Sequence, residues 1–339
     1  MVFITYFAES LVHYLGLLKK SALSEGTVRT RRTQLRAYFL FCKTYDLPAF
    51  PVTEQVYWLY LAFLVGYFSS YNSVNNYLSC LKQVNLYLGA DVTFFASAQI
   101  NFLKQAAKRV LAKPVGRKLL ITVDILLAIF KLLDFRHPFH VCMLTIFLVA
   151  FFSLLRKSNL VPTTIADVTS ASATHLRISD VSFHQDHCTL HVHKTKTIQF
   201  RQRALEIVLP FIPHSVLCPV SALKRHLRYV PADPEAPLFT IHTSTGFKPV
   251  TGYHFAKFLK SCIVSLGLDS TQYFPHNFRR GGATFAFHAG ASPLFIKFLG
   301  DWSSDTYMVY LVLNTTQKLN VAKTLAQHIP TTHDSVTTT

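Results

Sequence analysis

The sequence is poor in acidic residues and lacks the short motifs that mark several common kinds of site. Only 17 Asp and Glu stand against 34 Lys and Arg, which gives a formal net charge of +17 at pH 7. Neither GxGxxG nor GxxxxGKS/T occurs, so the usual dinucleotide and nucleotide phosphate loops are excluded. None of the six cysteines forms a CxxC pair, and we expect a reduced, intracellular protein.

A long apolar run is also missing. The most apolar stretch, residues 140–155, runs directly into Arg156 and Lys157. It is shorter than the ~20 apolar residues that a membrane-spanning helix needs. We therefore interpret it as a buried core helix and expect no membrane partner. The start of the chain lacks the succession of features that marks a signal peptide.

The residues that are abundant indicate a folded protein with an anionic partner. Half of the residues are hydrophobic and 29 are phenylalanine, which excludes a disordered chain and allows a core in each of two domains. The excess positive charge lies in both halves of the chain. It predicts a polyanionic partner, with nucleic acid ahead of an anionic membrane surface.

Helical periodicity dominates the first third of the chain. Residues 1–112 are predicted to form a bundle of four or five amphipathic helices. Residues 113–118 contain Pro, Gly and three charges, which is typical of a linker. A second domain is predicted over 119–328, and a disordered tail over 329–339.

Single residues indicate where helices begin, end and pack. Ser24 and Thr122 are candidate N-caps, and Gly89 is a candidate C-cap. In the helix that follows Ser24, one apolar stripe is expected to face the core. Its predicted members are Val28, Leu35, Phe39 and Phe41.

The second domain is predicted to contain one small sheet among its helices. Residues 175–210 alternate polar and apolar side chains, which predicts two or three short antiparallel strands with a hairpin near 194–203. The fold class is therefore mainly α with two domains. The alternating βαβ pattern of a doubly wound fold is not present.

The segment 275–311 has the densest chemistry. Pro275 suits the start of a helix, and His276 and Arg279 then project from one face of its first turn. Two donors at a positively polarised helix start make a phosphate cradle. Tyr307 and Tyr310 follow, three positions apart, on one face of a predicted helix.

Six side chains that handle phosphate or protons occur in order along the second domain. They are Arg156, Lys196, His276, Arg279, Trp302 and Tyr310. This series resembles the pattern of the tyrosine recombinases, which runs Arg, Lys, HxxR, His or Trp, and Tyr. The resemblance covers residues ~118–320. The segments "HNFRRGG" and "GDWSSDTYMVYL" resemble most closely the recombinases of eukaryotic Crypton and DIRS-like mobile elements.

The resemblance implies a DNA recombinase or integrase that cuts and rejoins strands through a covalent 3′-phosphotyrosyl intermediate. Tyr310 would be the nucleophile, and Arg156 with Arg279 would clamp the phosphate. The chemistry suits these groups, because a phenol has a pKa of ~10 and needs help to attack at pH 7. Two guanidinium groups can stabilise the negative charge that develops on phosphorus.

The remaining roles and the fold also follow from the resemblance. Lys196 would be the general acid, and His276 would share proton transfer and bind phosphate. Trp302 would donate its indole N–H or pack against the nucleophile segment. The N-terminal helices would form a SAM-like core-binding domain, and the second domain would have the DNA breaking-rejoining enzyme fold. No metal, ATP or other cofactor is required.

Three positions leave alternatives open. Spacing from Trp302 favours Tyr310 over Tyr307 by comparison with the family. Alternation places Lys194 and Lys196 on one face of a strand, so spacing alone does not separate them. The family often has an acidic residue three positions after the first arginine, where this chain has Asn159.

A histidine-rich stretch is the other candidate site. It contains His184, His187, Cys188, His191 and His193, but its alternation is typical of a strand and its spacing matches no standard zinc site. We therefore predict no metal site.

The predicted partner is double-stranded DNA, with self-association into a tetramer on that DNA. In a eukaryotic host the protein would act in the nucleus. The alternatives are a catalytically inactive, domesticated DNA-binding protein of the same fold and a type IB topoisomerase. The candidate DNA-contacting residues are Arg29, Arg31, Arg32, Arg36, Lys157, Lys194 and Arg280.

Overall fold

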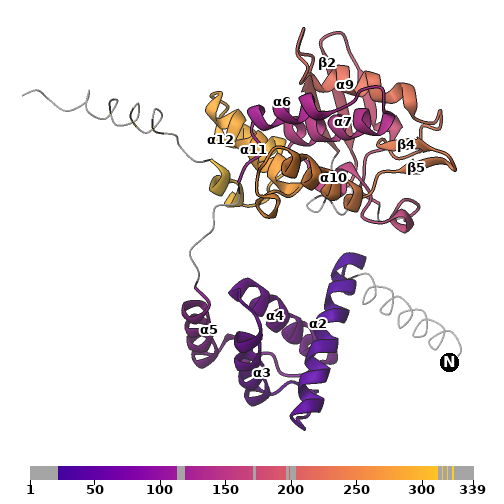
Figure 1. Ribbon diagram of the computed structural model, residues 1–339. Coiled ribbons are helices and arrows are strands. Elements are labelled where there is room, and N and C mark those ends of the chain that lie inside the picture. Colours follow the sequence, from indigo (N-terminus) through magenta and orange to yellow (C-terminus); the bar gives the residue numbers. More distant parts are fainter. Residues whose placement is uncertain are drawn as a thin grey trace, which may run out of the picture. The chain divides into compact units, whose positions relative to one another are not determined.

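The computed structural model describes residues 22–112, 119–170, 173–195, 198, 204–311, 315, 319 and 323. The chain divides into two compact units, Met1–Gly116 and Arg117–Thr339 (Figure 1). Each unit has its own hydrophobic core. The division falls inside the predicted linker. That linker and the predicted tail lie outside the described residues.

The described residues of the first unit form helices and connecting turns only. Its core is unusually aromatic, because Tyr38, Tyr57 and Tyr60 are almost completely buried. The helices are α2 (Glu25–Thr44), α3 (Glu54–Tyr67), α4 (Tyr71–Leu88), the 3-10 helix η1 (Phe94–Ala96) and α5 (Ala98–Val110).

Helix α2 buries a different stripe from the predicted one. Phe41 is buried and Leu35 is half-buried, as expected, but Val28 and Phe39 are exposed. Tyr38 is buried instead, because it lies one turn before Phe41 and packs its ring edge-on against other core aromatics. Phe39 lies about 100° further around the helix and therefore faces the rim of the core.

The predicted helix ends are formed. The Ser24 hydroxyl accepts a hydrogen bond from the first turn of α2, and the Thr122 hydroxyl does the same for α6 (Val123–Leu132). Gly89 adopts the left-handed conformation after α4, with φ of 70°. Local side-chain chemistry therefore determines these boundaries.

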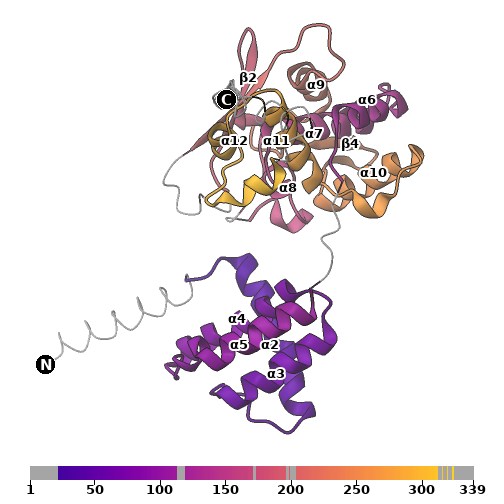
Figure 2. The ribbon, with the colours of Figure 1, turned by 90° about the vertical axis from the view of Figure 1, so that its left-hand side faces the viewer.

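Where it is described, the second unit is mainly helical, with two small antiparallel sheets (Figures 1 and 2). After α6, its helices are α7 (Pro138–Ser153), α8 (Lys157–Leu160), α9 (Pro219–His226), α10 (Gly252–Ser265), α11 (His276–His288) and α12 (Pro293–Leu299). Its 3-10 helices are η2 (Ile165–Asp167), η3 (Ile178–Asp180), η4 (Leu227–Tyr229), η5 (Ser270–Gln272) and η6 (Asp305–Tyr310).

Helix α7 is the predicted core helix, and every residue from 141 to 151 is buried. It runs through the middle of the second unit (Figure 2). Among the described residues, no helix is both long enough and apolar enough to cross a membrane. The helix ends at Ser153, and Leu154 turns the chain with φ of 53°. Arg156 therefore lies in the turn before α8 rather than on α7.

The predicted sheet has three strands in the order β1-β2-β3. They are β1 (Val181–Phe183), β2 (His187–Val192) and β3 (Leu205–Pro210). Strands β2 and β3 pair antiparallel and flank residues 193–204, which agrees with the hairpin predicted near 194–203. A second sheet was not predicted: β4 (Thr240–Thr243) pairs with β5 (Gly246–Pro249). Its strands are too short and too polar for an alternating pattern to stand out.

Two adjacent glycines allow α11 to pack closely against its neighbours. A Cβ atom on Gly282 would lie 2.0 Å from the carbonyl oxygen of Phe151 in α7. A Cβ atom on Gly281 would lie 1.9 Å from the carbonyl oxygen of Ile121. Neither carbonyl can move without shifting its main chain, so only glycine fits at these two positions.

Gly282→Ala is expected to lower the free energy of unfolding by about 2–3 kcal/mol, because the new methyl group overlaps a buried main-chain atom. Urea denaturation followed by circular dichroism measures this. Gly66→Ala is the matched control: Gly66 lies in α3, and a Cβ atom added there would have no neighbour within 4 Å. That change should leave stability equal or slightly higher. A Gly282→Ala protein as stable as the wild type would contradict the packing argument.

Candidate active site

The site is assembled where the turn after α7, the start of α11 and the turn after α12 meet. Arg279, on the first turn of α11, is almost completely buried. Its guanidinium donates to the carbonyl oxygens of Leu154, at 2.5 Å, and Gly300, at 2.6 Å. Its Cζ atom lies 3.8 Å from the centre of the Trp302 ring. Two helix ends and an aromatic face thus hold this cation in one orientation.

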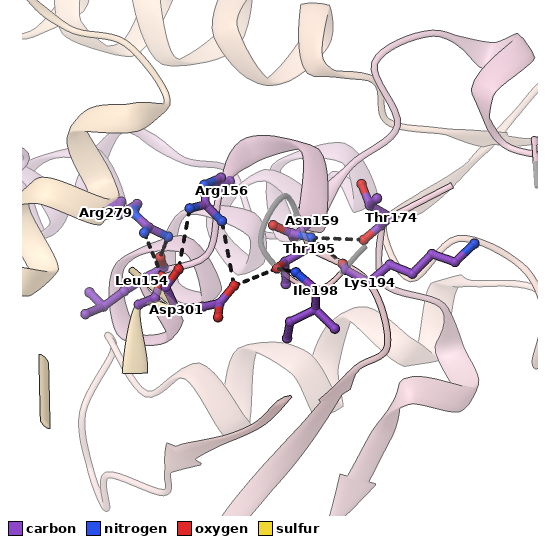
Figure 3. A network of polar contacts seen from close by, with 10 residues as sticks. Leu154, Arg156, Asn159, Thr174, Lys194, Thr195, Ile198, Arg279 and Asp301 are labelled. Carbon is purple, nitrogen blue, oxygen red and sulfur yellow. Dashed lines mark hydrogen bonds and ion pairs between the residues drawn. The ribbon is translucent and has the colours of Figure 1, made fainter. Parts of the chain in front are cut away.

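Arg156 lies beside Arg279 and is partly exposed, with 24% of its side chain accessible. Its Nη2 donates to the main-chain oxygen of Asp301 at 3.5 Å, and Nη1 lies 3.9 Å from the Asp301 carboxylate. Figure 3 shows both arginines reaching toward the segment that ends α12. This exposure leaves Arg156 accessible to a ligand.

The electrostatics of the two arginines favour a bound anion. Burial, followed by the neighbouring charge of Arg156, lowers the pKa of Arg279. Burial lowers the pKa of Arg156 as well, although Asp301 opposes that effect. Both shifts mean that the folded protein disfavours these cations relative to water. A phosphate placed between them would relieve that penalty.

Tyr310 lies next to these arginines, and its hydroxyl makes a hydrogen bond of 3.1 Å with Nε2 of His276. The two rings meet edge to face, with centroids 6.0 Å apart. The Arg280 guanidinium lies 5.3 Å from the centre of the Tyr310 ring. The Thr284 hydroxyl donates to the Tyr310 carbonyl at 2.7 Å, which ties this segment to α11. A half-buried phenol is thus in hydrogen-bond contact with an imidazole nitrogen, whose role as donor or acceptor depends on the tautomer of His276.

Tyr307 occupies a different environment. It is 6% exposed and packs in a small core cluster with Leu154, Ala283 and Ile296. The segment is a 3-10 helix, not the expected α-helix, and it ends at Tyr310. Sequence spacing placed both tyrosines on one face, but the structure gives them different surroundings. Tyr307 fills the core, whereas Tyr310 borders the arginines.

The structure describes Lys194 and Asn159 but not Lys196. Lys196 lies outside the described residues. Lys194 follows β2, and its side chain extends away from the arginines (Figure 3). Asn159 is buried and donates to the carbonyl oxygens of Thr174, at 3.3 Å, and Lys194, at 2.9 Å. Its described hydrogen bonds therefore hold the main chain, not Arg156.

The histidine-rich stretch pairs with carboxylates in the described structure. His187 contacts Asp186, His191 faces Glu206, and His193 contacts Asp180. Within the described residues, no three His, Cys, Asp or Glu side chains are grouped as metal ligands. The stretch forms β2 and its flanks, as the alternation predicted.

The candidate DNA-contacting residues differ in exposure. Arg29, Arg32 and Arg36 are exposed on α2, whereas Arg31 is half-buried. Lys157, at the start of α8, and Arg280, beside Tyr310, are also half-buried. The first three arginines therefore form an accessible basic face on α2.

Sequence reasoning missed two residues of the site. Asp301 is 4% exposed and contacts Arg156, and the Thr195 hydroxyl donates to its carboxylate at 2.5 Å. A signal was available, because two neighbouring arginines without the usual acid at position 159 require a carboxylate from another segment.

No protein-family model matches this sequence, and no curated protein sequence matches it. In fold, however, the chain is similar to solved structures of site-specific recombinases and integrases. It is similar to the Tn1549 transposon integrase in complex with transposon right end DNA, with a TM-score of 0.62 and 14% identity over 92% of this chain and 98% of that one.

Two further solved structures support the same fold. A lambda integrase dimer bound to a COC′ core site has a TM-score of 0.56 and 16% identity, covering 88% of this chain and 93% of that one. The XerH site-specific recombinase bound to palindromic difH substrate has a TM-score of 0.54 and 14% identity, covering 81% and 72%. At these identities the likeness establishes the fold alone.

Proposed function

We propose that this protein is a DNA recombinase or integrase that cuts and rejoins strands through a tyrosyl–DNA link. One observation carries the proposal: the Tyr310 hydroxyl bonds to His276 beside two anchored, partly desolvated guanidinium groups. That arrangement offers a nucleophile, a proton acceptor and a binding site for one phosphate.

The proposed reaction exchanges one phosphodiester for another. The Tyr310 oxygen attacks phosphorus, and the phenol proton passes to Nε2 of His276. The bond between phosphorus and the 5′-oxygen breaks, and Lys196, the general acid assigned from sequence, protonates that oxygen. Arg156 and Arg279 neutralise the charge on the non-bridging oxygens.

Rejoining is the same reaction in reverse, with a 5′-hydroxyl as the nucleophile. The tyrosyl phosphodiester conserves the energy of the broken phosphodiester bond. The proposed exchange would therefore need no ATP or other nucleotide to drive it. Trp302 would support both directions, because its ring holds Arg279 against the carbonyl groups at the helix ends.

The partner would be double-stranded DNA. In support, the Tn1549 integrase structure is a complex with transposon right end DNA, and the lambda integrase dimer is bound to a COC′ core site. The exposed arginines of α2 would make the first unit a core-binding domain. Paired cutting of two duplexes requires four active sites, so we extend the proposal to a tetramer on DNA. The motifs around Arg279 and Tyr310 support kinship with Crypton or DIRS-like elements, and hence action in a nucleus.

Replacing Arg29, Arg32 and Arg36 together with Gln is expected to weaken binding to duplex DNA of any sequence. The slope of log affinity against log salt should become shallower by up to about 0.9 for each phosphate that the variant no longer neutralises. Fluorescence anisotropy over a salt series measures this. Arg136→Gln is the control. Arg136 lies in the second unit, and it is exposed but paired with Asp134 of the same unit. An unchanged slope in the triple variant would contradict the assignment of this face.

The function is tested with a pool of nicked duplexes of random sequence. After incubation and denaturation in detergent, DNA that remains attached to protein is recovered and sequenced. The proposal predicts attached DNA with a shared sequence. Tight DNA binding without covalent attachment would instead favour the alternative of an inactive DNA-binding protein. Covalent attachment without sequence preference, combined with plasmid relaxation by a monomer, would favour the topoisomerase.

A further inference from the structure

The turn after α12 places a buried carboxylate between two parts of the site. Two described side-chain contacts of Asp301 lie there: an ion pair with Arg156 and a hydrogen bond from Thr195. Thr195 in turn accepts from the main-chain N–H of Ile198 at 3.0 Å. Figure 3 shows the carboxylate between the arginine and the threonine. It thus joins the arginine pair to the connection that follows β2.

The backbone at Asp301 is one that most side chains avoid. Helix α12 ends in a Schellman motif, in which the N–H of Trp302 bonds to the carbonyl of Lys297 and the N–H of Asp301 to that of Phe298. Asp301 therefore occupies the left-handed position, with φ of 51°, where glycine is usual. Aspartate tolerates this conformation better than most residues, so the turn can carry a carboxylate where glycine is usual.

No other acid is seen to support the arginines among the described residues. Asn159 stands where related enzymes often have a carboxylate, and its hydrogen bonds go to main-chain oxygens. Arg279 bonds to carbonyl oxygens of Leu154 and Gly300. Asp301 holds Arg156 through its carboxylate and also through its main-chain oxygen.

We propose that Asp301 is the positioning residue for Arg156 in this protein, in place of an acid at position 159. This inference rests on the proposed function, because it concerns how Arg156 meets the scissile phosphate. Asp301 would hold the Arg156 guanidinium at a fixed position beside Arg279. Its negative charge would also offset the repulsion between the two arginines before DNA binds. Thr195 would fix the carboxylate by donating to it.

The test is a double-variant cycle between Asp301→Asn and Arg156→Ala. Asn keeps the size of the side chain and tolerates the left-handed backbone, so the turn should persist. The rate of covalent attachment is measured in a single turnover on a nicked duplex recovered from the random pool. Asp301→Asn should slow the wild type by about 10–100-fold. In the Arg156→Ala background it should change the rate by no more than about twofold, because its partner is absent.

A modified substrate separates positioning from general damage. A methylphosphonate at the scissile position removes the negative charge that Arg156 neutralises. If Asp301 acts through Arg156, the Asp301→Asn defect should shrink on this substrate. A purely structural defect would be equal on both substrates. Thr195→Val should show a smaller defect of the same kind, and Thr195→Ser should restore the wild-type rate.

Asp305→Asn is the matched control, because Asp305 is an exposed acid in the same segment that pairs with Lys297. Its rate should equal that of the wild type. The outcomes are distinguishable: a wild type that forms no adduct overturns the proposed function itself. A wild type that forms adduct, with Asp301→Asn equally fast or additive with Arg156→Ala, overturns only the role of Asp301.

Discussion

Tyr310→Phe is expected to abolish covalent attachment to DNA while leaving the fold intact. Phenylalanine keeps the ring that packs edge to face with His276 and near Trp302, and it removes only the hydroxyl. The lost hydrogen bond is at a half-buried position, so the protein should remain stable. Detergent-resistant adduct on a nicked duplex is the measurement, and none should form.

Tyr307→Phe is the control that the structure provides for this experiment. Tyr307 is a core residue in the same 3-10 helix, so the substitution makes the same chemical change at a neighbouring position. Its adduct yield should stay close to that of the wild type. Adduct formation by the Tyr310→Phe protein, or loss of adduct in a folded Tyr307→Phe protein, would reverse the assignment.

Arg279→Lys is expected to slow adduct formation by about 10²–10³-fold, the typical effect of losing a preorganised donor to a transition-state oxyanion. The guanidinium spans the carbonyl oxygens of Leu154 and Gly300 and stacks on Trp302. A single ammonium cannot span both oxygens in the plane that the indole imposes. The rate should fall although the charge is retained.

Arg225→Lys controls for the substitution itself, because Arg225 also stacks on an aromatic ring, that of Phe135, in the same unit. Its adduct rate should match that of the wild type. Thermal unfolding of both variants checks that the site variant is folded. If a folded Arg279→Lys protein kept the wild-type rate, the planar clamp would have no role in the reaction.

The contacts that anchor Arg279 connect the stability of the second unit to the proposed reaction. The guanidinium bonds to the turn after α7 at Leu154, and the packing of α11 on α7 depends on Gly282. A change that separates these helices would displace the arginine from its carbonyl partners. Variants such as Gly282→Ala should therefore lose adduct formation as well as stability.

Much of the fold was predictable because it depends on local signals. The caps at Ser24, Thr122 and Gly89 form as predicted, and the apolar run that ends before Arg156 is the core helix. The stripe on α2 was predicted incorrectly at Val28 and Phe39. Tyr38, Phe39 and Phe41 lie close together in the sequence, and only tertiary packing selects which of them are buried. The β4-β5 hairpin was missed because four-residue polar strands carry almost no periodic signal.

The ordered pattern of residues in the sequence predicted a grouping of side chains, and their roles in catalysis stay a prediction. The structure brings Arg156, Arg279, His276 and Tyr310 into one neighbourhood. The absence of an acid at position 159 was a signal for a carboxylate from another segment, but nothing in the sequence identified Asp301, 145 positions from Arg156, as that residue. The difference between the two tyrosines likewise depends on burial, which spacing does not report.

The most direct test of the account is to identify the residue that carries DNA in the wild-type adduct. The adduct is digested with nuclease and protease, and the nucleotide-bearing peptide is sequenced by mass spectrometry. We predict a nucleotide linked through its 3′-phosphate to Tyr310. A nucleotide on Tyr307 or on another side chain, or one linked through a 5′-phosphate, would contradict it.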